Sequence, residues 1–138
     1  MRKIIENTCF GMLIVAFLAV LVIFISAFFG IHRYLVVSGS MEPSLYAGDI
    51  VFVNTNVDFE DVEIGDVIIF QYEDKKIIHR VIDEIWIDGE KHLKTKGDNN
   101  KRADGYLTTK YNFCGVALSK FKIPKLGLLI DYKNLIER

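Results

Sequence analysis

A serine in a glycine-containing turn is the first candidate for chemistry in this chain. Ser40 lies in the segment Ser38-Gly39-Ser40-Met41-Glu42-Pro43. On a tight turn, a serine can present its hydroxyl and its own backbone N–H to one substrate carbonyl, which acyl transfer to serine requires. A plain turn has the same residue types. The interpretation therefore depends on whether the chain also supplies a base.

A serine hydroxyl is a poor nucleophile until a base within hydrogen-bond reach removes its proton. The chain has 3 histidines. His79 lies inside the apolar stretch 77–82, where an imidazole would be desolvated unless it had a partner or a purpose. His32 and His92 are more simply read as solvated residues. His79 is therefore the candidate base, and a structural histidine with satisfied hydrogen bonds is the alternative.

A polar loop at 96–105 supplies two carboxylates, Asp98 and Asp104. A carboxylate that accepts the second ring N–H of a histidine fixes its tautomer and stabilises the imidazolium that forms during the reaction. An exposed surface loop would have the same composition. A calcium loop would need more alternating oxygen ligands than this spacing supplies.

The residues that must position these groups have the pattern of strands. β-Branched and aromatic residues dominate several short runs, and Asp88-Gly89 has the composition of a two-residue hairpin turn. We predict a mainly β domain in which Phe113 to Ser119 forms another strand and Leu126 to Ile136 is amphipathic. The other expected strands are 49–54, 66–72, 76–87 and 90–96.

No charged residue occurs between Glu6 and His32, and residues 10–31 are almost wholly apolar. About 20 helical residues at about 1.5 Å each span a bilayer core of roughly 30 Å. A cleavable secretory signal is the rival, but its apolar region is usually roughly 7–15 residues long and ends at a small-x-small site. We favour a retained transmembrane anchor at 10–31, after a short cytoplasmic segment at 1–9. Arg2 and Lys3 place the N-terminus in the cytoplasm by the positive-inside bias.

The remaining residues, 32–138, form one extracytoplasmic domain in this interpretation. The whole chain has 17 Lys and Arg against 18 Asp and Glu, so it has no excess of positive charge for a nucleic-acid backbone. Its 2 cysteines, Cys9 and Cys114, lie on opposite sides of the expected membrane and do not pair. We expect no metal site and no cofactor, because the sequence has no Cys-x-x-Cys or His-x-x-x-His spacing.

Taken together, these features resemble the type I signal peptidases, membrane serine endopeptidases that remove signal peptides from exported proteins. The matching segments, in the family's order, are the N-terminal anchor, 38–43 with Leu45, the Gly-Asp strand at 65–70, Ile78-His79-Arg80-Val81, and 97–100 with Asp104. A histidine stands where the common bacterial enzymes have a lysine base. This resembles the endoplasmic-reticulum type, which archaea and some Gram-positive bacteria also have.

The resemblance implies a signal-peptidase-like β-sheet domain with Ser40 as nucleophile and His79 as general base. It implies that Asp104, or Asp98 as second choice, orients His79, and that Ser38 helps the Ser40 N–H to bind the oxyanion. The last loop reads Lys101-Arg102-Ala103-Asp104-Gly105 where the bacterial pattern has a serine and a further arginine, so the choice between the two carboxylates stays open. The pockets for small side chains before the cut would map to Val36, Met41, Leu45 and Ile78.

The same resemblance implies signal peptides of secretory precursors as substrates, a lipid bilayer beside the site, and accessory membrane subunits in some relatives. The catalytic domain would lie outside the cell membrane, or in the endoplasmic reticulum if the source is eukaryotic. Two alternatives remain open. One is a specialised peptidase that matures a few surface or spore-coat proteins, and the other is a non-catalytic membrane-tethered β-module that binds partners.

Overall fold

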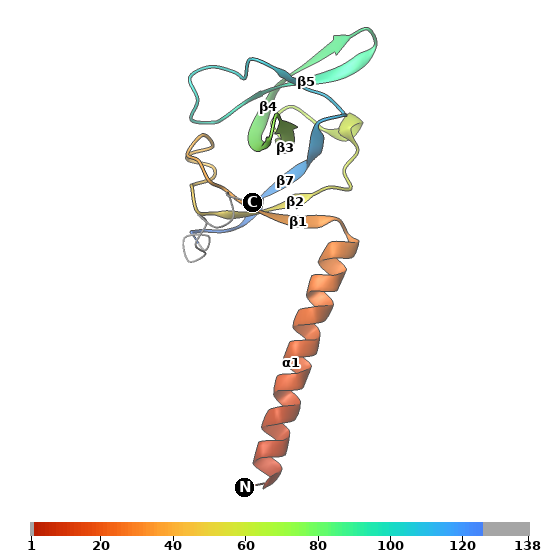
Figure 1. The fold of residues 1–138 in the computed structure, drawn as a ribbon, viewed down its shortest axis with the longest axis vertical. Coiled ribbons are helices and arrows are strands. Elements are labelled where there is room, and N and C mark those ends of the chain that lie inside the picture. The colour runs from red at the N-terminus through yellow and green to blue at the C-terminus, as the bar shows by residue number, and fades with distance from the viewer. Residues whose placement is uncertain (1, 126–138) are drawn as a thin grey trace.

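The computed structural model describes residues 2–125, without the side chains of 2–9, 26–27 and 119–121. One long helix precedes a β domain (Figure 1). The helix is α1, Arg2–Phe28. The strands are β1 Ile31–Leu35, β2 Ile50–Asn54, β3 Val67–Tyr72, β4 Lys75–Ile87, β5 Glu90–Lys96, β6 Leu107–Thr108 and β7 Phe113–Ile123, with a short 3-10 helix η1 at Phe59–Asp61.

All seven strands belong to one antiparallel sheet of order β1-β2-β7-β3-β4-β5-β6. The long strand β4 pairs with β3 through residues 75–80 and with β5 through residues 80–87. Before residue 80, β4 therefore pairs with β3 along one edge, and among the described residues no strand pairs with its other edge. His79 lies in that stretch, opposite Ile68 of β3.

Strand β3 is buried on both faces, which explains its unbroken apolar sequence Val67-Ile-Ile-Phe70. Successive side chains of a strand point to opposite faces. Val67 and Ile69 accordingly pack into one hydrophobic cluster, and Ile68 and Phe70 pack into another. The first cluster also holds Met41 and Leu45, so the core packs directly against the segment that carries Ser40.

The hairpin between β4 and β5 forms at the predicted turn. Asp88 and Gly89 have φ values of 52° and 81°, which is the left-handed pair that a type I′ turn requires. The φ > 0 conformation costs little at a glycine and is tolerated by aspartate.

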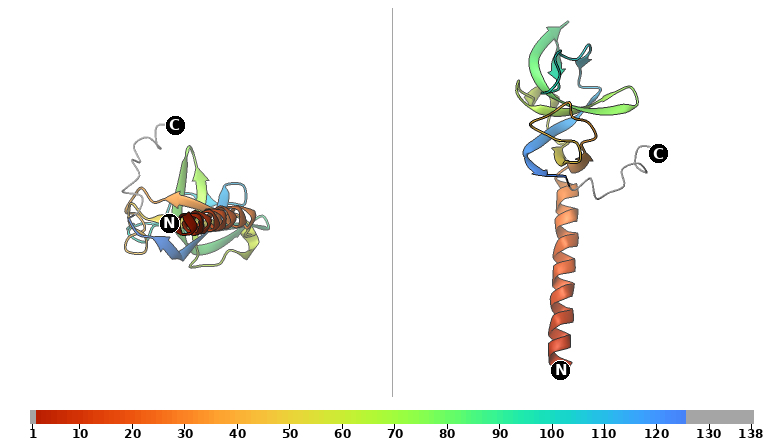
Figure 2. Two further views of the ribbon diagram at one scale, coloured as in Figure 1. Left: turned by 90° about the horizontal axis from the view of Figure 1, so that it is seen from below. Right: turned by 90° about the vertical axis from the view of Figure 1, so that its left-hand side faces the viewer.

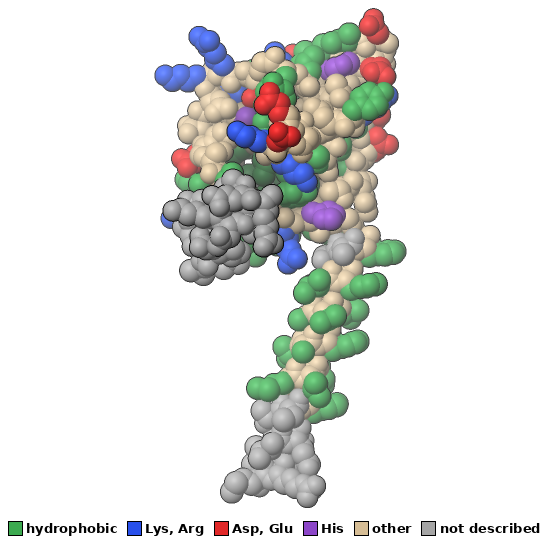
Figure 3. All heavy atoms as spheres, viewed as in Figure 1, with side chains coloured by type: hydrophobic (Ala, Val, Ile, Leu, Met, Phe, Trp, Pro, Cys, Tyr) green, Lys and Arg blue, Asp and Glu red, His purple; other side chains and the backbone are tan. Residues whose placement is uncertain are grey.

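Helix α1 leads away from the β domain (Figure 2). It ends before Gly30, whose φ of 66° suits the left-handed residue that follows many helices. Side chains are described for its residues 10–25 and 28, and these are mostly large, apolar and exposed (Figure 3). Within the described part of the chain, no helix is both long enough and apolar enough to cross a membrane.

The predicted mainly β fold is confirmed, with strand ends within one residue of those expected for β2, β3, β4 and β5. The strand predicted at 113–119 continues to Ile123. Sequence reasoning missed β1, which places His32 opposite Val53 in the sheet, as well as η1 and the two-residue β6. The amphipathic segment predicted at 126–136 lies outside the described residues.

Candidate active site

Ser40 lies in a loop whose two ends are joined by backbone hydrogen bonds. The Val36 N–H donates to the Asp49 carbonyl at 2.9 Å, and the Gly48 N–H donates to the Val36 carbonyl at 2.8 Å. Inside the loop, Met41 is 1% exposed and Leu45 is fully buried. These two apolar anchors fix the loop on the core, so the adjacent serine has a defined position.

Asp49 holds the far end of this loop from inside the protein. It is 1% exposed and accepts hydrogen bonds from the backbone N–H groups of Tyr46 and Lys125, both at 3.0 Å. Lys122 of β7 lies 3.3 Å from the carboxylate and donates to the Ser44 carbonyl at 2.6 Å. Burial acts to raise the pKa of Asp49, but these hydrogen bonds and the Lys122 charge outweigh it, and the net pKa is lowered.

Ser40, His79 and Asp104 form one chain of hydrogen bonds. Nδ1 of His79 lies 2.7 Å from Oδ2 of Asp104, and Nε2 lies 3.3 Å from Oγ of Ser40. With the ring proton on Nδ1, His79 donates to the carboxylate and Nε2 is free to accept from the serine hydroxyl. His79 is 7% exposed, so bulk water does not compete strongly for either ring nitrogen.

Asp104 is itself held by Thr95 of β5. The threonine hydroxyl donates to Oδ2 of Asp104 at 2.6 Å, and the Asp104 N–H donates to the Thr95 carbonyl at 2.9 Å. Tyr106 lies two residues after Asp104, and its ring stacks on the Tyr72 ring with 3.7 Å between the ring centroids. Burial, followed by the nearby Asp104 charge, raises the pKa of Tyr106 to about 12. Sheet pairing and aromatic packing thus fix the loop that carries the carboxylate.

The second carboxylate of this loop, Asp98, does not contact His79 through a hydrogen bond. It accepts two hydrogen bonds from Arg80, from Nε at 2.8 Å and from Nη2 at 2.7 Å. The bond from the Arg80 guanidinium lowers the pKa of Asp98 despite partial burial, and the same pairing raises the pKa of Arg80. Arg80 also donates to the Gly65 carbonyl and to the Ser44 hydroxyl.

The residues around Asp98 dock on the serine turn. The Asn99 N–H donates to the Ser40 carbonyl at 2.8 Å, and the Asn99 side chain donates to the Gly39 carbonyl at 3.1 Å. A Cβ on Gly97 would lie 2.6 Å from the Ser40 carbonyl oxygen and 2.9 Å from Nε2 of His79. Only a glycine lets this loop approach the serine and the histidine so closely.

The two groups that the resemblance implies for binding an oxyanion are the Ser38 hydroxyl and the Ser40 N–H. The Ser38 and Ser40 hydroxyl oxygens are 3.2 Å apart. Among the hydrogen bonds of the described residues, none uses the Ser40 N–H. That N–H is therefore free to donate to a bound ligand.

A cleft of about 350 Å³ opens beside Ser40, between segment 35–41 and strand β4. Val36, Met41 and Ile78, three of the residues expected to form substrate pockets, lie in its lining. Leu45 does not line the cleft, because it is fully buried in the core. The complete lining is Leu35, Val36, Val37, Ser38, Ser40, Met41, Lys75, Lys76, Ile77, Ile78, His79 and Asn100.

Sequence reasoning missed Thr95 and Lys122 as supports of the site. A threonine in a strand and a lysine near the end of another have many ordinary roles, so their types give no signal without the strand register. The other two histidines take no part in the site. His92 contacts the Glu90 carbonyl through Nδ1 at 3.0 Å, and His32 lies on β1.

The serine, imidazole and carboxylate are connected in the order that serine hydrolases use. A sequence model of the signal peptidase family, peptidase S26, matches residues 9–113 of this chain. The match covers well over half of the 138 residues. The chain therefore belongs to the signal peptidase family, peptidase S26.

Individual relatives agree with this assignment. The signal peptidase complex catalytic subunit sec11 of Schizosaccharomyces pombe is 34% identical over 130 residues, covering 72% of this chain and 68% of the relative. The SEC11 subunit of Zygosaccharomyces rouxii is 46% identical over 104 residues, covering 67% and 59%. Signal peptidase I W of Bacillus subtilis is 41% identical over 80 residues, covering 56% and 42%. The chain thus covers between 42% and 68% of the length of these curated relatives.

Proposed function

We propose that this chain is a membrane-associated serine endopeptidase that removes signal peptides from exported proteins. The observation that carries the proposal is the continuous hydrogen-bond chain from Ser40 through His79 to Asp104, in a chain of the signal peptidase family. A β-module that only binds partners has no need of a desolvated imidazole placed between a hydroxyl and a carboxylate.

In the proposed reaction, Oγ of Ser40 attacks the carbonyl carbon of the scissile bond while Nε2 of His79 takes the hydroxyl proton. The oxyanion accepts hydrogen bonds from the Ser40 N–H and the Ser38 hydroxyl. Asp104 stabilises the imidazolium. His79 then returns the proton to the leaving amine, and an acyl group remains on Ser40. Water, activated by His79, releases the signal peptide and restores the serine.

The lining of the cleft supports a proposed preference for small side chains before the cut. Val36, Met41 and Ile78 make shallow apolar walls close to Ser40. Such walls accept small residues at the first and third positions before the scissile bond and exclude larger ones by shape. We therefore propose cleavage after a small-x-small sequence, with an extended peptide lying along the cleft.

Helix α1 is the proposed membrane-associated element. Its described side chains include exposed Phe17, Ile23 and Phe24, which water solvates poorly. No helix within the described residues meets the length and hydropathy of a span by itself. The single-pass anchor expected at 10–31, with the N-terminus in the cytoplasm and the β domain on the outer face of the cell membrane or in the reticulum lumen, is therefore kept here as a proposal. Protease protection of the β domain in sealed vesicles tests this topology.

The names of the relatives are compatible with an enzyme that acts alone and with a subunit of a complex. The yeast relatives are named as catalytic subunits of a signal peptidase complex, and the Bacillus subtilis relative is named signal peptidase I W. We propose that this chain supplies the catalytic core in either setting. Purification under mild detergent, followed by identification of co-purifying membrane proteins, distinguishes a lone enzyme from a complex.

The proposal is tested by cleavage of a signal-bearing precursor in liposomes. The wild-type chain is compared with Ser40→Ala and His79→Ala, and His92→Ala serves as the matched histidine control. We expect cleavage after the small-x-small sequence by the wild type and by His92→Ala, and none by the two site variants despite normal folding. Undiminished cleavage by folded Ser40→Ala would overturn the assignment of the nucleophile. If the purified wild type is inert, the same comparison is made in membranes that contain its partners.

A further inference from the structure

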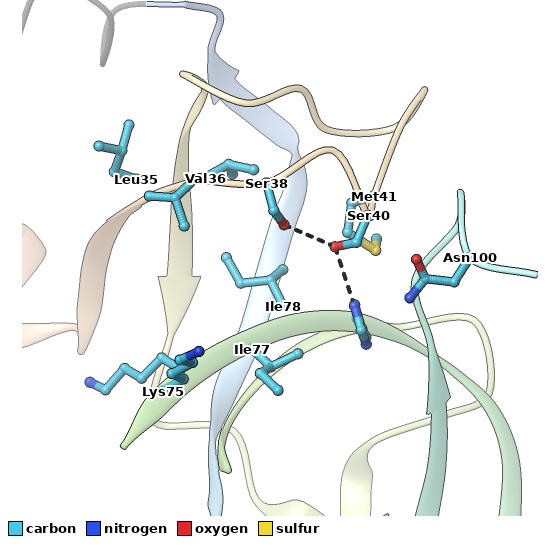
Figure 4. Close-up of a pocket in the computed structure, with 12 residues that line it drawn as sticks. Leu35, Val36, Ser38, Ser40, Met41, Lys75, Ile77, Ile78 and Asn100 are labelled. Carbon is cyan, nitrogen blue, oxygen red and sulfur yellow. Dashed lines mark hydrogen bonds between the residues drawn. The ribbon is translucent and has the colours of Figure 1, made fainter. Parts of the chain in front are cut away.

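The end of the cleft far from Asn100 has a charge that the proposed chemistry does not use. Lys75 and its neighbour Lys76 on β4 both line the cleft, and no aspartate or glutamate lines it. Figure 4 shows Lys75 and Leu35 at one end, Asn100 at the other, and Ser40 between them. The lining thus carries two lysines and no carboxylate to balance them.

Lys76 is held in place by Tyr34 of β1. Its Nζ donates to the tyrosine hydroxyl at 3.2 Å and lies 4.9 Å from the centre of the ring. Tyr34 in turn packs against the core. The acidic residues of the preceding turn, Glu73 and Asp74, do not neutralise the pair, because among the described residues no carboxylate lies within 4.0 Å of either ammonium group.

The length of the cleft tells which part of a substrate reaches these lysines. His79 and Lys75 are four residues apart on β4, which corresponds to about 13 Å at about 3.3 Å per residue. An extended peptide covers that distance in about four residues. If its scissile carbonyl lies at Ser40, the lysines face the fourth or fifth residue away from the cut.

The apolar walls of the cleft indicate in which direction the substrate peptide runs. Val36 and Ile78, which would hold small side chains before the cut, lie on the same side of Ser40 as the lysines. The chain after the cut must then leave toward Asn100. The lysines therefore face the upstream part of the substrate.

We propose that Lys75 and Lys76 form a charge-selective subsite that favours an acidic side chain, and disfavours a basic one, four or five residues before the cleaved bond. This proposal rests on the peptidase function proposed above. The lysines act on binding of the substrate and take no part in the chemical step, so selectivity should appear in KM more than in kcat. Exposed charges contribute modestly and are screened by salt.

The experiment uses the full chain in detergent micelles and three peptides that differ only at the fifth residue before the cut, which is Asp, Ser or Lys. We expect the wild type to cleave the Asp peptide about three- to tenfold more efficiently in kcat/KM than the Lys peptide. The preference should shrink as salt is raised. The double variant Lys75→Gln/Lys76→Gln should cleave all three peptides alike.

Lys110→Gln is the matched control, because it removes a lysine that pairs with Glu90 away from the cleft. We expect this control to keep the wild-type preference. Equal cleavage of the three peptides by the wild type would overturn the subsite and leave the peptidase function standing. A preference that survives in the double variant, or that follows a charge placed after the cut, would also overturn it. Failure to cleave any peptide, both in micelles and in membranes that contain its partners, would contradict the peptidase function itself.

Discussion

Arg80 donates hydrogen bonds to both carboxylate oxygens of Asp98, at 2.8 and 2.7 Å. The residue before Arg80 on the same strand is His79, which contacts the other loop carboxylate, Asp104, at 2.7 Å. Successive side chains of a strand point to opposite faces. The two neighbours on β4 therefore take different carboxylates, and only Asp104 is in place to orient the imidazole.

Because the two carboxylates have different partners, the same Asp→Asn substitution should affect mainly kcat at Asp104 and mainly stability at Asp98. Asp104→Asn should lower kcat by roughly a hundred- to ten-thousandfold, because the histidine loses the partner that fixes its tautomer. Asp98→Asn should leave kcat within about tenfold of the wild type and destabilise the fold by roughly 1–3 kcal/mol, because Arg80 loses a charged acceptor. Peptide cleavage and thermal unfolding of both variants check this. A larger loss of kcat in Asp98→Asn would reverse the two roles.

The Asp98 ion pair also predicts how stability depends on pH. Arg80 lowers the pKa of Asp98 in the folded protein below its unfolded value, which is about 3.9 for aspartate. The folded state then binds fewer protons, so the stabilisation is complete above the unfolded pKa and is lost as the pH falls through the folded pKa. Asp98→Asn should flatten the fall in midpoint temperature below about pH 4. An unchanged slope in the variant would contradict this account.

Gly97 predicts a steric route to inactivation. In Gly97→Ala, the new Cβ would meet the Ser40 carbonyl oxygen at 2.6 Å and Nδ2 of Asn100 at 2.7 Å. Since the first neighbour is backbone, the loop must move, and we expect kcat to fall roughly a hundredfold. Gly105→Ala is the control, because a Cβ there has no atom within 4 Å. Equal activity of the two variants would show that the loop accommodates the methyl group.

Thr95 predicts a positioning effect on the same carboxylate. Thr95→Val keeps the shape of the side chain and removes the hydroxyl that donates to Asp104 at 2.6 Å. We expect kcat to fall roughly ten- to a hundredfold with KM little changed, since a hydrogen bond to a charged group contributes about 1.5–3 kcal/mol. Thr95→Ser should restore most of the activity. A variant that loses stability but keeps kcat would show a purely structural role.

Much of the fold could be predicted from the sequence because the strands carry strong local signals. Alternating and β-branched residues marked β2, β3 and β4, and Asp88-Gly89 marked the hairpin. β1 carries little such signal, because its residues His32 and Arg33 interrupt the apolar pattern right after α1. Its place in the sheet depends on pairing with β2, a long-range contact that local composition does not reveal.

The sequence allowed the serine and the histidine of the site to be predicted, but it did not decide which carboxylate contacts the histidine. Ser40 and His79 stood out by their surroundings, whereas the choice between Asp98 and Asp104 stayed open. In the structure His79 contacts Asp104, which Thr95 holds, whereas Asp98 pairs with Arg80. Leu45 illustrates a different ambiguity, because an apolar residue beside a nucleophile fits a substrate pocket or a core equally well by sequence.

The most direct test of the account is to trap the acyl-enzyme. Acid quenching during turnover of a reactive ester substrate, followed by peptide mapping by mass spectrometry, shows which atom carries the acyl group. The account predicts an acyl group on Ser40 in the wild type and none in folded His79→Ala. An acyl group on Ser38, or unchanged acylation of Ser40 without His79, would contradict a nucleophile activated by the imidazole.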